Sequence, residues 1–128
     1  MDTIHVGLVG PPRAGKSTLI RMMQQQQASA KLHVQVATHP SPALDVVCVV
    51  VDGSQELVDV KALSCGHRNV ILVLHKSDLE RSESVRAAVR DFQFVNTTVH
   101  SMASVAVLVE FIVVVHKTAR DRRRCVCL

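Results

Sequence analysis

The sequence has almost no aromatic side chains: among its 128 residues there are three Phe and no Trp or Tyr. Domains that bind nucleic acid usually combine a basic face with aromatic residues for base stacking. Here the formal charge of +4 arises entirely after His116, where five basic residues stand against one acid, and the rest of the chain is neutral. We therefore expect no nucleic-acid partner, and a core of Val, Leu, Ile and Ala.

Cysteines are also too few and too poorly placed for a disulfide framework. Cys48 lies inside an apolar run, and Cys125 and Cys127 crowd the C-terminus. That usage favours a reducing compartment. Because a glycine-rich segment directly follows the first apolar run, no signal peptide is expected. The expected location is therefore the cytoplasm.

Long apolar runs are missing as well. The longest one near the C-terminus, Val105 to Val115, contains Glu110 and is shorter than the roughly 20 residues of a membrane span. It is interpreted as a buried helix. The length fits one domain, which we place at residues 1–118, followed by a basic tail at residues 119–128.

Short β-branched runs alternate with segments of helical periodicity along the rest of the chain. The predicted strands are Thr3–Val9, Lys31–Ala37, Asp45–Val51, Asn69–Leu74 and Phe94–Val99, and the predicted helices are residues 17–27, 55–63, 82–92 and 104–118. Strands that alternate with helices imply a parallel sheet with right-handed crossovers. Ligands bind such sheets at the carboxyl ends of the strands.

The residues from Gly10 to Ser17, GPPRAGKS, match G-x-x-x-x-G-K-[ST] between a predicted strand and a predicted helix. In this arrangement backbone amides and the positive helix end face a β-phosphate, Lys16 reaches the β- and γ-phosphates, and the Ser17 hydroxyl ligates Mg²⁺. The predicted contact residues are Gly10, Arg13, Ala14, Gly15, Lys16, Ser17 and Thr18. The expected fold class is therefore α/β, a P-loop NTPase-like three-layer sandwich with a mostly parallel sheet and helices on both faces. The alternative is a strand-to-helix turn with a chance Lys-Ser pair.

The phosphate loop alone does not choose between a kinase and a GTPase, but a second motif favours the latter. His75-Lys76-Ser77-Asp78 follows a buried apolar run, where small GTPases of the Ras type carry [NT]-K-x-D, and here the chain resembles that family. The resemblance implies that Asp78 binds guanine and that Lys76 packs over the base. His75 replaces the family's Asn or Thr. The alternative is an ordinary polar turn with Asp78 as a helix cap.

A third segment, Val99-His100-Ser101-Met102-Ala103, is similar to a degraded form of the family's S-A-[KL] loop. The resemblance implies that a backbone amide at Ser101 or Met102 reads the guanine carbonyl. A simple turn at the start of a helix is the competing interpretation. Together the motifs imply GTP or GDP as ligand, with Mg²⁺.

The family's hydrolytic elements are largely missing. Residues 37–41 read Ala-Thr-His-Pro-Ser, where the family has D-x-x-G, so there is no Asp for the metal shell and no Gly for the γ-phosphate. Asp52 is either a metal-shell acid or, as we prefer, a residue near the ligand edge that does not touch the metal. The sequence thus predicts a guanine-nucleotide-binding protein that is at most a slow GTPase.

A rival resemblance concerns the stretch from Lys31 to Ser54, which is similar to centromere protein M, a GTPase-like scaffold without nucleotide. It implies a nuclear interaction module whose partners are effector or scaffold proteins. The C-terminal Cys125-Val126-Cys127-Leu128 fits a geranylgeranylation pattern at Cys125 with neighbouring arginines, which implies the cytoplasmic face of a membrane. The alternative is a solvated basic end.

Overall fold

The computed structural model describes part of the chain as a set of strands and two helices. The described residues are 3–10, 15–26, 31–37, 41, 43–52, 69–75, 83, 86, 90, 93–98 and 100–126, with the backbone alone for 122–126. The elements are β1 (Thr3–Val9), α1 (Lys16–Gln24), β2 (Lys31–Val36), β3 (Val46–Asp52), β4 (Val70–His75), β5 (Phe94–Asn96) and α4 (Met102–Val126). Each predicted strand is present, with ends that differ by up to three residues. The helices predicted at 55–63 and 82–92 lie outside the described residues, apart from helical backbone at Glu83 and Arg86 and a turn at Arg90.

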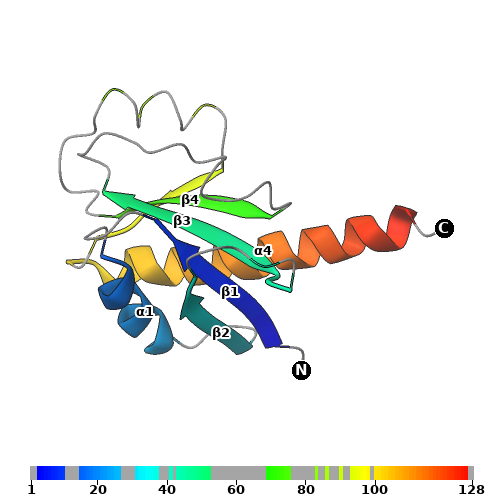
Figure 1. The fold of residues 1–128 in the computed structure, drawn as a ribbon, viewed down its shortest axis with the longest axis horizontal. Helices are drawn as coiled ribbons and strands as arrows, with labels where there is room; N and C mark the ends of the chain where they lie inside the picture. Colours follow the sequence, from blue (N-terminus) through cyan, green and yellow to red (C-terminus); the bar gives the residue numbers. More distant parts are fainter. Residues whose placement is uncertain are drawn as a thin grey trace.

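The strands form one sheet in the order β2-β1-β3-β4-β5, and every neighbouring pair is parallel. Figure 1 shows this sheet with α1 and α4 on the same side of it. All seven residues of β3 are buried, because a central strand in a parallel sheet is covered on both faces. The predicted α/β class with a parallel sheet is therefore confirmed.

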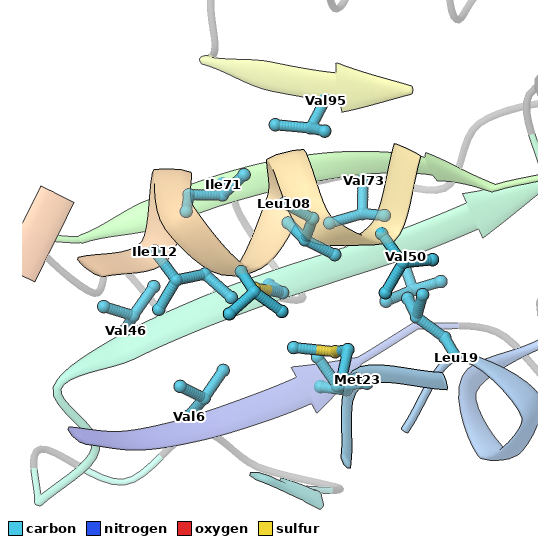
Figure 2. Packing of buried hydrophobic residues seen from close by; sticks show 14 of the residues in the cluster. Val6, Leu19, Met23, Val46, Val50, Ile71, Val73, Val95, Leu108 and Ile112 are labelled. Carbon is cyan, nitrogen blue, oxygen red and sulfur yellow. The ribbon is translucent and has the colours of Figure 1, made fainter. Parts of the chain in front are cut away.

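The larger core cluster lies between the sheet and the two helices. Its side chains interdigitate from the strands and from α1 and α4, as Figure 2 shows for Leu19, Val50 and Leu108. The opposite face of the sheet carries a second buried cluster that includes Val47, Val49 and Leu72. Most side chains in both clusters are Val, Leu and Ile, as expected from the scarcity of aromatic residues, and the larger cluster also contains Met22, Met23 and Cys48.

Helix α4 differs from its prediction in length. It begins at Met102 and runs to Val126, past the end predicted at Thr118 and through most of the segment expected to be a separate tail. The prediction was wrong because the polar residues after Val115 include Lys and Arg, which are good helix formers and are favourable near a helix C-terminus. Over Met102–Asp121 the helix is long and apolar enough to cross a membrane by length and composition, with a mean hydropathy of 1.8. One face of it nevertheless packs on the sheet.

Candidate functional site

The predicted motif segments converge at the carboxyl edge of the sheet. Gly10 follows β1, His75 ends β4, and Ser101 lies in the turn after β5. Because parallel strands all end at one edge, segments far apart in sequence become neighbours there. The described residues bring the phosphate loop, the first residue of the His-Lys-Ser-Asp motif and the last loop into one region.

The two glycines of the phosphate loop stand where a side chain does not fit. Gly10 has a φ of 152°, and a Cβ added there would overlap the carbonyl oxygen of Val50. Gly15 has the left-handed φ of 92°, and an added Cβ would lie 2.5 Å from Cδ2 of His75. Glycine is the residue that adopts such backbone angles without a steric penalty. Both positions therefore show the close backbone path that the motif requires.

Helix α1 begins directly at this loop and is open to an anion. The first helical bond is from the Leu19 amide to the Gly15 carbonyl oxygen, at 3.0 Å, so the amides before Leu19 point out of the helix end. No acidic residue occupies the first turn, and Gly15 at the N-cap supplies no side-chain cap. The helix end thus keeps its positive partial charge available to a ligand.

Lys16 spans the loop. Its Nζ donates to the carbonyl oxygen of Gly10 at 2.6 Å, which places the ammonium group beside the first residue of the motif. A lysine in that position is near any phosphate that the loop amides hold. Ser17 and Thr18 follow in the first turn of α1 and are exposed, so the Ser17 hydroxyl is accessible to a ligand.

His75 lies beneath the phosphate loop and is almost fully buried, with 1% of its surface exposed. Its ring edge faces Gly15, and its Nδ1 is 2.8 Å from Oγ1 of Thr97. His75 stands where small GTPases carry an Asn or Thr. In this chain the ring contacts the phosphate loop through its edge and is oriented by Thr97.

Thr97 is a site residue that the sequence analysis missed. It is fully buried, and with Asp52 and His75 it completes the buried polar residues among those the structure describes. Asp52 and His75 end the strands β3 and β4, Thr97 directly follows β5, and Asp52 pairs with His75 in the strand register. One sequence signal could have identified Thr97: each apolar strand is followed by a polar residue, and parallel strands place these residues at the same edge of the sheet. A polar layer therefore separates the core from the ligand edge.

Asp52 belongs to this layer, since 5% of it is exposed. Among the described residues no group of three or more His, Cys, Asp or Glu side chains is arranged to hold a metal ion. In P-loop sites an acidic side chain, phosphate oxygens and water hold Mg²⁺ together with the hydroxyl of the loop Ser or Thr. The accessible hydroxyl of Ser17 at the loop fits that role, and the glycine cradle fits a phosphate.

The turn after β5 is closed by its own hydrogen bonds. The Ser101 amide donates to Thr98 O at 3.2 Å, so that amide is turned inward. Ser101 also caps α4, because its Oγ accepts from the Ser104 amide at 3.2 Å. Met102 follows as the first residue of α4 and is 41% exposed. Of the two amides predicted to read a guanine carbonyl, the one of Met102 is better placed at the helix end.

Several predicted site residues lie outside the described residues. These are Arg13 and Ala14 of the phosphate loop, and Lys76 and Asp78 of the base-recognition motif. Cys125 lies in α4, where only the backbone is described. The predicted base contacts and the predicted lipidation site therefore stay predictions.

Comparison with known proteins agrees with this geometry. A family model described as 50S ribosome-binding GTPase matches residues 5–120. No curated protein matches the sequence significantly. Among solved structures, translation elongation factor SelB from Methanococcus maripaludis in its apo form has a TM-score of 0.69 at 14% identity, over 91% of this chain. The cytosolic domain of the T. maritima FeoB iron transporter in its GMPPNP form has a TM-score of 0.66 at 15% identity, over 90% of this chain.

The chain is much shorter than these proteins. It spans about a third of the SelB chain, at 34%, and 64% of the FeoB domain. At such low identity the likeness concerns the fold alone.

Proposed function

Because the chain belongs to the family of 50S ribosome-binding GTPases, we propose that it binds GTP or GDP with Mg²⁺ and hydrolyses GTP slowly or not at all. The observation that carries the proposal is the phosphate loop itself. Two glycines that admit no side chain, a lysine held at 2.6 Å from the first loop carbonyl and an uncapped helix end lie together where β1 leads into α1. That combination supplies amide donors, a cation and a hydroxyl to a polyphosphate.

Guanine selection is the part of the proposal that rests on resemblance. Asp78 would accept hydrogen bonds from the guanine edge, Lys76 would pack over the base, and the Met102 amide would meet the guanine carbonyl. Two contacts of the described residues support it. His75 touches the phosphate loop and Thr97, and Thr97 leads into the turn that ends at Met102. His75 thereby links Gly15 to Thr97 at the carboxyl edge of the sheet.

Slow hydrolysis follows from how little chain connects α1 to β2. Only residues 27–30 separate Gln26 from Lys31, and four residues span at most about 14 Å. Helix α1, with nine residues, is itself about 14 Å long, so this connection is too short to reach the phosphate loop and return. No D-x-x-G follows β2 either. The site therefore has the phosphate-binding half of a GTPase without a residue to orient the attacking water.

Calorimetry with GDP, GTP and ATP in Mg²⁺ tests nucleotide binding, with Lys16→Ala as the deficient variant. We expect binding of GDP and GTP, weaker binding of ATP, and a loss of about a hundredfold in Lys16→Ala. Lys117→Ala, a change of the same charge on the exposed surface of α4, is the matched control and should bind normally. A folded protein without affinity for any of these nucleotides would overturn the proposal.

Single-turnover measurements with bound GTP test the proposal that hydrolysis is slow or absent. We expect a half-life no shorter than that of intrinsic GTPases, whose rates are on the order of 10⁻⁴ per second without an activating partner. Fast turnover by the isolated chain would show that another residue replaces the missing switch elements.

A scaffold without nucleotide is the second candidate, and the exposed apolar residues of α4 favour it. Val107 and Val114 are 60% and 56% exposed, which is unusual for a helix whose other face forms the core. The Lys16→Ala variant separates the two functions, because a scaffold would keep its cellular interactions without the loop lysine. A nucleotide-dependent protein would lose them.

We further propose geranylgeranylation at Cys125 when the chain is made in a eukaryotic cell. The C-terminal pattern and the neighbouring arginines are the support. Mass spectrometry of the protein and of Cys125→Ser tests it. An unmodified wild-type chain from such a host would remove lipidation from the proposal.

A further inference from the structure

Helix α4 is apolar on two faces, and the sheet accounts for one of them. Val105, Leu108, Val109 and Ile112 pack into the core and are at most 1% exposed. On the opposite side, Val107 and Val114 are 60% and 56% exposed. A helix that is apolar all round is usually covered on all sides, by protein or by lipid. The outer side of α4 therefore needs an explanation beyond the fold.

The exposed Val107 and Val114 form a continuous apolar surface with Phe111, which is half-buried and also packs against the core cluster. Positions 107, 111 and 114 are spaced by four and three residues, so they lie along one stripe of the helix. With Ala106 and Glu110 they line a shallow hollow of about 420 Å³. We call Val107, Phe111 and Val114 the outer stripe. Contiguous exposed apolar surface of this kind marks a site of interaction with a protein or a membrane.

The charge of α1 and α4 favours a membrane over a protein as the partner of the outer stripe. In sequence, α1 and α4 contain seven basic residues and two acids, whereas the rest of the chain has eight basic residues and nine acids. Helix α1 has no acid at all, and its Arg21 is exposed. In α4, Lys117 and Arg120 are exposed beyond the outer stripe. The excess positive charge of the protein is thus concentrated in the layer that carries the stripe.

Figure 1 shows that the C-terminal half of α4 continues past the sheet, away from the strands. The last fully buried residue of the helix among those described is Ile112, and the basic residues follow it. An apolar stripe that leads into a projecting basic segment is the pattern of helices that lie in the plane of an anionic membrane surface. Such helices bury their apolar face 5–10 Å into the boundary between headgroups and acyl chains, on the order of a helix radius.

From these observations we propose that the outer stripe of α4 lies on an anionic lipid bilayer, with Lys117, Arg120 and Arg21 at the level of the headgroups. The interaction is independent of lipidation and of nucleotide binding. Glu110 lies in the hollow beside the stripe and opposes the interaction, because a carboxylate meets both the apolar layer and the anionic headgroups. Its flexible stem allows the charged end to stay in water.

Vesicle flotation of the full chain tests the proposal, with protein made in bacteria so that no prenyl group is attached. Vesicles of phosphatidylcholine with phosphatidylserine are compared with vesicles of phosphatidylcholine alone. We expect binding to the anionic vesicles that weakens as salt is raised. Val107→Asp and, as a second variant, Val114→Asp should each reduce the partition coefficient about tenfold or more, since each removes one buried side chain and adds a like charge.

Val36→Asp is the matched control, because Val36 is an exposed valine, at 51%, in β2. It makes the same chemical change away from α4 and should leave the partition coefficient unchanged. Lys117→Gln and Arg120→Gln should each lower it roughly fivefold, and Glu110→Gln should raise it. Far-UV circular dichroism of each variant reports that the fold is intact.

Three results would overturn the proposal. The first is no wild-type binding to anionic vesicles, and the second is an equal loss of binding in Val36→Asp and Val107→Asp. The third is a loss of binding on removal of Lys117 or Arg120 with no effect of Val107→Asp, which would mean a purely electrostatic partner. RNA is added to the flotation assay as a competitor, because the family description mentions ribosome binding. Displacement of the protein from the vesicles by RNA would indicate such an electrostatic partner.

Discussion

The carboxyl edge of the sheet and the outer stripe of α4 are the two functional candidates of this protein, and they are built in opposite ways. At the edge, each residue has a defined neighbour: Gly15 meets His75, His75 meets Thr97, and Lys16 meets Gly10. On the outer stripe, Val107 and Val114 are mostly exposed to solvent. The first region is specified by the packing of the fold, whereas the second leaves its contacts to another surface.

The largest contrast should come from the two faces of α4. Leu108 is fully buried in the core cluster, whereas Val107 beside it is 60% exposed. We expect Leu108→Ala to lower the free energy of unfolding by about 2–5 kcal/mol, because it leaves a cavity. Val107→Ala should change it by less than about 0.5 kcal/mol. Chemical denaturation measures both, and equal losses would mean that the outer stripe is covered within the molecule.

A second contrast compares two glycines. Gly15 has a left-handed φ of 92°, and a Cβ there would lie 2.5 Å from the His75 ring. Gly15→Ala should therefore lower the free energy of unfolding by about 1–3 kcal/mol and abolish nucleotide binding. At Gly7 the atom that a Cβ would meet is the end of the flexible Leu44 side chain, so Gly7→Ala should keep nucleotide binding. Retained GDP affinity in Gly15→Ala would contradict the structure of the loop.

A third prediction concerns the polar layer. Thr97→Val keeps the shape of the side chain but removes the hydroxyl that bonds Nδ1 of His75 at 2.8 Å. We expect a loss of about 1–3 kcal/mol in the free energy of unfolding, because a buried ring nitrogen loses its partner. GDP affinity should fall as well, since the ring orients the loop. Thr18→Val, an exposed threonine in the first turn of α1, gives the comparison for stability.

The smallest expected effect depends on pH. Burial raises the pKa of Cys48 from 9.0 to about 12. Above pH 9 the thiol of the unfolded chain ionises while that of the folded chain does not, so the unfolded state binds fewer protons and stability falls between pH 9 and 12. At pH 10 the loss is about 1 kcal/mol. Cys48→Ala removes this slope, and denaturation of both proteins at pH 8 and pH 10 measures the difference. Parallel curves would contradict the raised pKa.

These contrasts also show how far the sequence could predict the site. The glycines and Lys16 follow from one contiguous motif, and the strands follow from β-branched runs such as the one that ends at Asp52. Thr97 could not be identified in that way, because its partner His75 is distant in sequence and the bond depends on which strands are neighbours. The end of α4 was predicted too early. The basic residues after Lys117 were interpreted as a solvated tail, but Lys and Arg continue a helix equally well.

By itself the sequence determined the α/β class, the parallel strands and the phosphate loop, because these depend on local periodicity and on contiguous residues. The order of the strands, the polar layer of Asp52, His75 and Thr97, and the division of α4 into a buried and an exposed face depended on the tertiary structure. The physical reason is that Leu108 and Val107 are equally apolar, and only the position of the sheet determines which of them water can reach.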